Sequence, residues 1–160
     1  MLNPNKFLQL ISVLFTLTSC STVLSKEFID KGYFVIDLKQ KVDWLKCSAG
    51  QQWNEEECGG TPIKLSLMEA EEALKILNEQ IDGEWRLPNR KELERLVCKR
   101  CEGPKIDQEL FPNTPAEPFW TSQRNWWSPK FFWSVNFFTG HTYGRFVPEK
   151  KLFVRFLRER

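Results

Sequence analysis

The sequence predicts an α+β domain in which two short helices pack on antiparallel β-strands. Apolar and polar residues alternate over 131–138, and a Thr139-Gly140 turn follows, which is typical of a β-hairpin. An apolar stripe at helical spacing runs from Leu67 to Leu77. Strands come first, two helices follow and strands return, an order that indicates α+β architecture.

Two short strands are expected at the start of this domain. Apolar runs over 33–36 and 42–45 flank the charged turn 39–41. The segment 47–61 is rich in Gly, Gln and Glu, and we expect it to be a loop.

Both helices have recognisable start signals. Ser66 and Glu69 form a capping box, which predicts a helix over 67–80. Asn89 is a suitable cap for a second helix, which we expect to stop near Cys98.

Strands return after a Pro-rich loop over 103–118. We expect them to begin at Phe119-Trp120, to continue over 131–138 and 141–147, and to end with 152–157. The 13 Phe and 7 Trp of the chain suit a β-rich fold with an aromatic core.

Residues 1–19 are interpreted as a bacterial lipoprotein signal peptide. Lys6 precedes an apolar run over 7–17, and Leu17-Thr18-Ser19-Cys20 has the pattern of a lipobox. The run is too short to span a bilayer, which takes about 20 residues. An ordinary secretory signal would need no cysteine after the cleavage point.

Lipidation of Cys20 would anchor the mature protein to a membrane, and two or more acyl chains hold stably. We expect residues 20–30 to be a lipidated tether and residues 31–160 to be one domain. Ser21 follows the cysteine where Asp would favour another destination, so analogy with lipoprotein sorting favours the outer membrane of a bacterial cell envelope.

Charge is unevenly distributed along the mature chain. Residues 21–85 hold 7 Lys and Arg against 13 Asp and Glu, whereas residues 86–160 hold 15 against 8. The two halves could neutralise each other by packing together, or the basic half could present a face to an anionic polymer. No nucleic-acid partner is expected.

Four cysteines remain when Cys20 is lipidated. Outside the cytoplasm an even set is most often disulfide-bonded, and we favour the local pairs Cys47–Cys58 and Cys98–Cys101 among three connectivities.

Zinc binding and thiol-redox chemistry are the alternatives for Cys98-x-x-Cys101. A four-cysteine zinc site would need a second knuckle, which the spacing of Cys47 and Cys58 does not supply. A thioredoxin-like pair would stand at the start of a helix, whereas this one follows a helical pattern.

We expect no catalytic residue, metal or cofactor. His141 is the one histidine and lies in a hairpin, where a histidine is ordinary. Glu55-Glu56-Glu57 are interpreted as a solvated loop, with a carboxylate pair or a calcium site as the alternative.

Several arginines are expected to be structural. Arg86 is predicted to be buried near Trp85, to pair with a carboxylate and so to join a helix to a sheet. Arg155 and Arg158 stand three apart in a predicted strand and therefore point to opposite faces, so that one could pair with an acid inside the domain.

An aromatic and basic surface is the candidate ligand site. Aromatic rings stack on sugars or proteins, and basic groups hold sulfate or phosphate. The alternative is that the aromatic residues are core and the lysines solvated. The candidate residues are Trp126, Trp127, Lys130, Arg145, Lys150, Lys151, Arg158 and Arg160.

Five motifs in order over about residues 33–158 resemble the Lcl C-terminal domain family, a bacterial extracytoplasmic domain long of unknown function. They are Val42-Asp43-Trp44-Leu45-Lys46-Cys47-Ser48-Ala49-Gly50-Gln51-x-Trp53-Asn54, Trp85-Arg86-Leu87-Pro88-Asn89-x-x-Glu92-Leu93-x-x-Leu96-Val97, Ile106-Asp107 with Phe111-Pro112-Asn113-Thr114-Pro115, Phe119-Trp120-Thr121-Ser122, and Val154-Arg155-Phe156-Leu157-Arg158.

The resemblance implies an α+β domain on a cell surface or in the periplasm. In the namesake collagen-like adhesin the domain is associated with binding of sulfated glycans. The Arg86-Leu87-Pro88 motif is also distantly C-type-lectin-like. The chain departs from the family at Glu55-Glu56-Glu57, where Gly, Ser or Thr is frequent, and in Trp126-Trp127, where many members are rich in Tyr.

These observations predict a non-enzymatic envelope lipoprotein that binds polyanionic, sulfated glycans or an envelope partner protein, as an adhesion module. The alternative function is that of an envelope enzyme or thiol-redox factor using Cys98 and Cys101.

Overall fold

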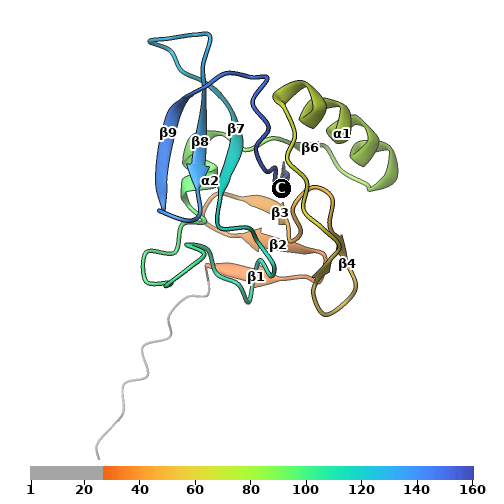
Figure 1. Ribbon diagram of the computed structural model, residues 1–160. Coiled ribbons are helices and arrows are strands. Elements are labelled where there is room, and N and C mark those ends of the chain that lie inside the picture. Colours follow the sequence, from red (N-terminus) through yellow and green to blue (C-terminus); the bar gives the residue numbers. More distant parts are fainter. Residues whose placement is uncertain (1–26) are drawn as a thin grey trace, which may run out of the picture.

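The largest sheet joins the first and last strands of the chain. The computed structural model describes residues 27–160, and the sheet has the order β1–β2–β3–β10–β6 with all pairs antiparallel (Figure 1). Its strands are β1 (Phe28–Asp30), β2 (Phe34–Asp37), β3 (Val42–Leu45), β10 (Leu157–Glu159) and β6 (Trp85–Arg86). The C-terminal strand therefore lies inside the sheet, between β3 and β6.

A second antiparallel sheet carries the long hairpin that extends from one end of the molecule (Figure 1). It has the order β7–β8–β9, with β7 (Pro118–Arg124), β8 (Phe132–Asn136) and β9 (His141–Phe146). A small third sheet pairs β4 (Gln52–Trp53) with β5 (Cys58–Gly59). The predicted α+β class is confirmed.

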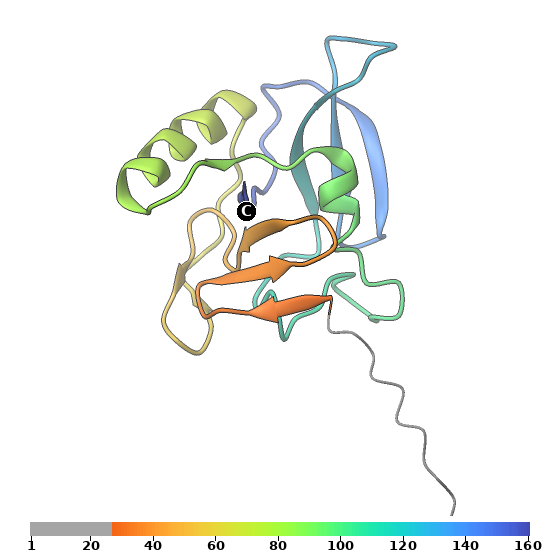
Figure 2. The same cartoon turned by 180° about the vertical axis from the view of Figure 1, so that it is seen from behind.

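The two helices begin where the sequence predicts. In α1 (Leu67–Gln80) the Ser66 side chain accepts the Glu69 N–H at 3.2 Å, and the Glu69 carboxylate accepts the Ser66 N–H at 2.7 Å. In α2 (Arg90–Glu94) Asn89 is the cap. Figure 2 shows α2 beside the β7–β9 sheet and α1 on the opposite flank.

The second helix is shorter than the sequence predicts. It ends at Glu94 rather than near Cys98, because the chain turns and Val97 forms an antiparallel bridge with Ile106. Val97 is extended and cannot continue a helix. The apolar residues from Leu93 to Val97 therefore mark a segment that faces the core, not a longer helix.

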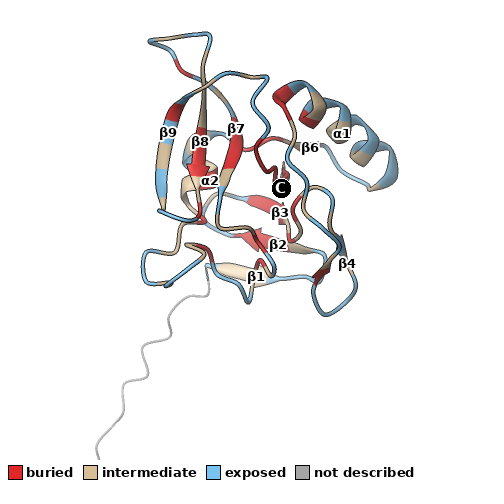
Figure 3. Ribbon diagram, viewed as in Figure 1, coloured by how far each residue is buried: buried red, intermediate tan, exposed pale blue. Residues whose placement is uncertain are grey.

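Two clusters of buried side chains hold the elements together. Figure 3 marks the buried residues in red on strands of both larger sheets and at one end of α1. One joins the large sheet, α2 and the β7–β9 sheet through residues such as Trp44, Leu93 and Phe119. The other lies under α1 and includes Trp120 and Val154.

Three segments differ from the sequence prediction. Phe28–Asp30 was expected in the tether but is an edge strand paired with β2. The predicted loop 47–61 contains the β4–β5 pair. The predicted strand 152–157 is wrong for most of its length, since only Leu157 belongs to a strand.

The segment before β10 is extended but has no single partner strand. The Leu152 N–H donates to Leu65 O at 3.0 Å, whereas the Phe153 N–H donates to Pro118 O at 3.2 Å. The Val154 carbonyl accepts from yet another segment. Because the neighbours change at each residue, the buried apolar run forms isolated bridges instead of a strand.

Candidate functional site

The lipobox cysteine, Cys20, lies outside the described residues, as does the predicted signal peptide. The described chain begins at Glu27, at the end of the molecule opposite to the tip of the β7–β8 hairpin (Figure 1). Among residues 27–160, no helix is long and apolar enough to cross a bilayer.

The four remaining cysteines form the two local disulfides that the sequence favours, Cys47–Cys58 and Cys98–Cys101. Cys58 is buried, whereas Cys98 and Cys101 are half-buried in a turn after α2. Within the described range, no group of three His, Cys, Asp or Glu side chains could hold a metal ion.

The β7–β8 hairpin ends in two exposed tryptophans. Trp126 is 69% and Trp127 70% exposed, and their rings stack with centroids 3.8 Å apart. The Asn125 N–H donates to Phe131 O, and the Asn125 side-chain amide donates to Gly144 O, each at 2.8 Å. The base of the tip is thus hydrogen-bonded across β8 and to β9, and the indoles face solvent.

Three cations belong to the strands and the loop of this end of the sheet. Arg124 and Lys130 lie on the hairpin, each over a Phe ring, with 4.8 and 5.0 Å between cation and ring centroid. Arg145 follows Gly144, the residue to which Asn125 is hydrogen-bonded. The stretch 119–148 holds no Asp or Glu, so no carboxylate of this sheet neutralises the cations. We call Trp126, Trp127, Arg124, Lys130 and Arg145 the aromatic–basic tip.

Two predicted lysines lie in the loop after β9. The Lys151 ammonium lies 2.8 Å from the Glu69 carboxylate at the start of α1. The hydrogen bond from Lys151, helped by those from Ser66, lowers the pKa of Glu69 to about 2. Lys150 is exposed beside it. Lys151 is therefore engaged within the fold.

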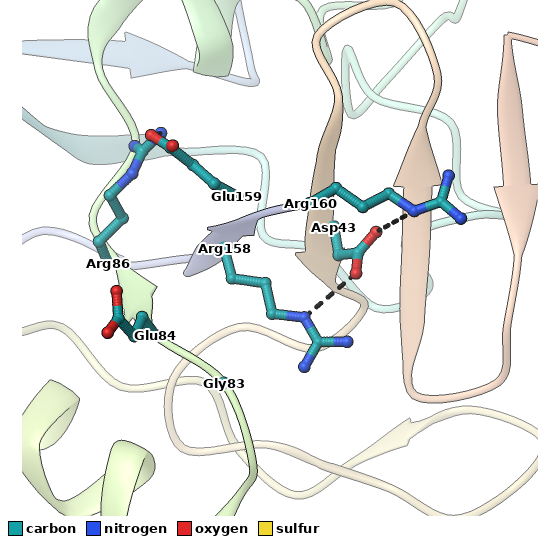
Figure 4. Close-up of a pocket in the computed structure, with 7 residues that line it drawn as sticks. All are labelled: Asp43, Gly83, Glu84, Arg86, Arg158, Glu159 and Arg160. Carbon is teal, nitrogen blue, oxygen red and sulfur yellow. Dashed lines mark hydrogen bonds and ion pairs between the residues drawn. The ribbon is translucent and has the colours of Figure 1, made fainter.

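The two C-terminal arginines lie elsewhere, in a hollow of about 590 Å³ beside β10 (Figure 4). There Arg158 and Arg160 both point toward Asp43, with Nε–O distances of 3.1 and 3.8 Å. Arg86 lines the same hollow and pairs with Glu159 at 3.2 Å. The structure thus separates Arg158 and Arg160 from the aromatic–basic tip.

Arg86 has the predicted structural role. Its guanidinium donates to both oxygens of Glu92, at 2.9 and 2.8 Å, and so joins β6 to α2. The hydrogen bond to Glu92 raises the pKa of Arg86. Burial of Glu92 opposes ionisation, but the bonds from Arg86 and Asn89 give it a lowered pKa overall.

Arg155 is the inward arginine, and no carboxylate contacts it among the described residues. It is completely buried, donates to Leu45 O, Lys46 O, Ser48 Oγ and Thr114 Oγ1, and lies over an aromatic ring. Desolvation lowers the pKa of Arg155 to about 9. The expectation of an inward arginine paired with an acid is met by Arg158 and Asp43 instead.

His141 and the Glu55-Glu56-Glu57 run are exposed, as a hairpin histidine and a solvated loop would be. The Asn54 side chain accepts the N–H groups of Glu56 and Glu57, which fixes the turn.

The sequence analysis missed Arg124 as a member of the tip. Its place two residues before Trp126, in a stretch without carboxylates, was the available signal.

The family model of the Lcl C-terminal domain matches residues 33–158. No curated protein matches the chain. Since the family match covers most of the sequence, the chain belongs to the Lcl C-terminal domain family, and the family predicted from the five motifs is confirmed.

Proposed function

We propose that this Lcl C-terminal domain protein is a non-enzymatic binding module of the bacterial cell envelope, which holds polyanionic, sulfated glycans at its aromatic–basic tip. The observation that carries the proposal is the stacked pair Trp126 and Trp127, exposed among cations in a stretch without carboxylates. An exposed apolar patch rimmed by polar residues is typical of an interaction site.

The aromatic and the basic residues of the tip bind different parts of the glycan. The indole faces stack on the CH faces of sugar rings, and Lys130, Arg124 and Arg145 hold the sulfate groups. Lipid on Cys20 would attach the opposite end of the domain to a membrane, so that the tip points away from the anchor. This arrangement suits an adhesion module.

The test is binding of the full-length protein to heparin and to neutral dextran across a salt series. We expect saturable heparin binding that persists at about 0.15 M salt, and no dextran binding. Replacing Trp126 and Trp127 by Ala should weaken heparin binding about tenfold. Replacing Lys130 and Arg145 by Ser should reduce the slope of the logarithm of the binding constant against the logarithm of the salt concentration by about 2, in analogy with counterion release.

Phe138→Ala is the matched control. Phe138 is as exposed as the two tryptophans but lies at the β8–β9 turn, at the other end of the same sheet. Its replacement should leave binding unchanged. If heparin does not bind, or if the tip variants bind as the parent does, the proposal is wrong and the envelope partner protein becomes the better candidate.

A further inference from the structure

A groove of about 490 Å³ runs beside the aromatic–basic tip. One wall is the β7–β8 hairpin, and the other consists of the first turns of α1 and the loop after β9. Its volume lies in the range of small-ligand sites, about 300–1,000 Å³. The groove is therefore large enough to take a unit of a bound polymer.

The two walls carry opposite charges. Arg124 and Lys130 line the hairpin wall, whereas Glu71 and Glu149 line the wall of α1 and the loop. In the described part of the chain, no ion pair joins any of these four side chains to another or to a third residue. Arg124 donates to Pro129 O at 2.8 Å, and Glu71 interacts electrostatically with Lys75, but neither contact neutralises its charge in an ion pair. A charged ligand can therefore supply the missing ionic partners.

The groove between these charges is apolar. Leu67 and Leu87 are buried at its base, and Phe132 and Pro148 are half-buried beside them. Met68 stands at the rim with 71% exposure. An apolar surface between polar walls suits the CH face of a sugar ring.

We infer that this groove recognises a glycan carrying protonated amino groups as well as anionic groups. The ammonium group lies between Glu71 and Glu149, and the neighbouring anionic group is held by Arg124 and Lys130. The inference rests on the proposed function, because the anionic groups belong to the polymer that the tip binds.

The effect of free amino groups on the affinity of the polymer has opposite signs for this groove and for a surface that is only basic. Each ammonium group lowers the net negative charge of a polymer, so a merely basic surface binds the amine-bearing polymer less tightly than its N-acetylated form. Carboxylates placed opposite the cations reverse this order, since they gain a partner only from the free amine.

The experiment compares two polymers made from one heparin batch. One is N-desulfated and has free amino groups; the other is the same material after N-acetylation, so both carry the same O-sulfates. Binding of the full-length protein is measured at about pH 6, where the amines are protonated. We expect the free-amine polymer to bind roughly three- to tenfold more tightly, the range that two exposed ion pairs supply.

The double variant Glu71→Gln with Glu149→Gln should lose this preference or reverse it. Glu72→Gln with Glu79→Gln is the matched control, because it removes the same charge from the protein outside the groove lining. The control should keep the preference of the parent.

Two results overturn the inference alone: equal or weaker binding of the free-amine polymer by the parent, or a preference that survives loss of Glu71 and Glu149. If neither polymer binds, the proposed function and the inference fail together. Binding without the preference leaves the proposed function intact.

Discussion

Arg158 on β10 and Asp43 on β3 are direct cross-strand partners, and Arg158 Nε lies 3.1 Å from Asp43 Oδ2. Asp43 is buried, so its carboxylate depends on this cation and on Arg160 for compensation. Arg158 and Arg160, which the sequence predicts to bind a ligand, therefore neutralise a buried carboxylate on the central strand of the large sheet.

Arg158→Ala should destabilise the protein by about 2 kcal/mol without weakening heparin binding, because it leaves the buried carboxylate of Asp43 with only the more distant Arg160 as a partner. Urea unfolding measures the change in the free energy of unfolding, and the heparin-binding assay measures the affinity of the variant. Arg160→Ala is the control: its side chain is half-exposed and farther from Asp43, so it should cost less than about 0.5 kcal/mol. A loss of heparin affinity in Arg158→Ala would place the ligand at the hollow of Figure 4 instead.

Arg155 should be among the most sensitive positions of the core. Arg155→Ala removes the donors of two backbone carbonyls and two hydroxyls, so we expect a loss of about 3 kcal/mol in urea unfolding. Arg155→Lys keeps the charge but not the planar fork, and should recover only part of that loss. Full stability in the lysine variant would show that the charge alone matters there.

Local signals predicted much of this fold. The Ser66 and Glu69 capping box lies within four residues, and it fixes the start of α1. The two disulfides are also local. By contrast, the place of β10 between β3 and β6 depends on residues far apart in the chain, such as Arg158 with Asp43 and Leu157 with Arg86, and no local pattern encodes that pairing.

Local signals also predict part of the candidate site, but not the residues whose partners lie far away in the chain. Trp126 and Trp127 stand between Asn125 and a Ser128-Pro129 turn, which is where a hairpin tip is expected. Side-chain pairing of Lys151 with Glu69 bridges distant segments, so the charge pattern alone could not remove Lys151 from the ligand set.

Acid should weaken the fold partly through Glu69. Its pKa is held at about 2 in the folded protein, against an ordinary value of 4.5, so the stabilisation is present above pH 4.5 and is lost as the pH falls toward 2. Glu69→Gln should therefore flatten the fall of the melting temperature over that window. Glu79→Gln, on the exposed side of the same helix, should leave the curve unchanged. Parallel curves for Glu69→Gln and the parent protein would contradict the role assigned to Lys151.

The two disulfides should open at different concentrations of a reductant. Cys98–Cys101 is half-buried with Lys99 and Arg100 between its cysteines, and cations favour the thiolate that exchange requires. In the other bond Cys58 is buried and only Cys47 is half-buried, which makes that bond less accessible to a reductant. Alkylation and mass spectrometry after graded dithiothreitol should therefore detect Cys98 and Cys101 first.

The thiol-redox alternative requires that Cys98 and Cys101 change reversibly between dithiol and disulfide at the reduction potential of a redox factor. A structural bond instead needs strong reductant, and its replacement by Ser at both positions should leave heparin binding unchanged. Reduction at the potentials of thiol oxidoreductases, about −120 to −270 mV, would favour the redox function over the binding module. Resistance below about −300 mV would leave Cys98–Cys101 as a brace for the turn after α2.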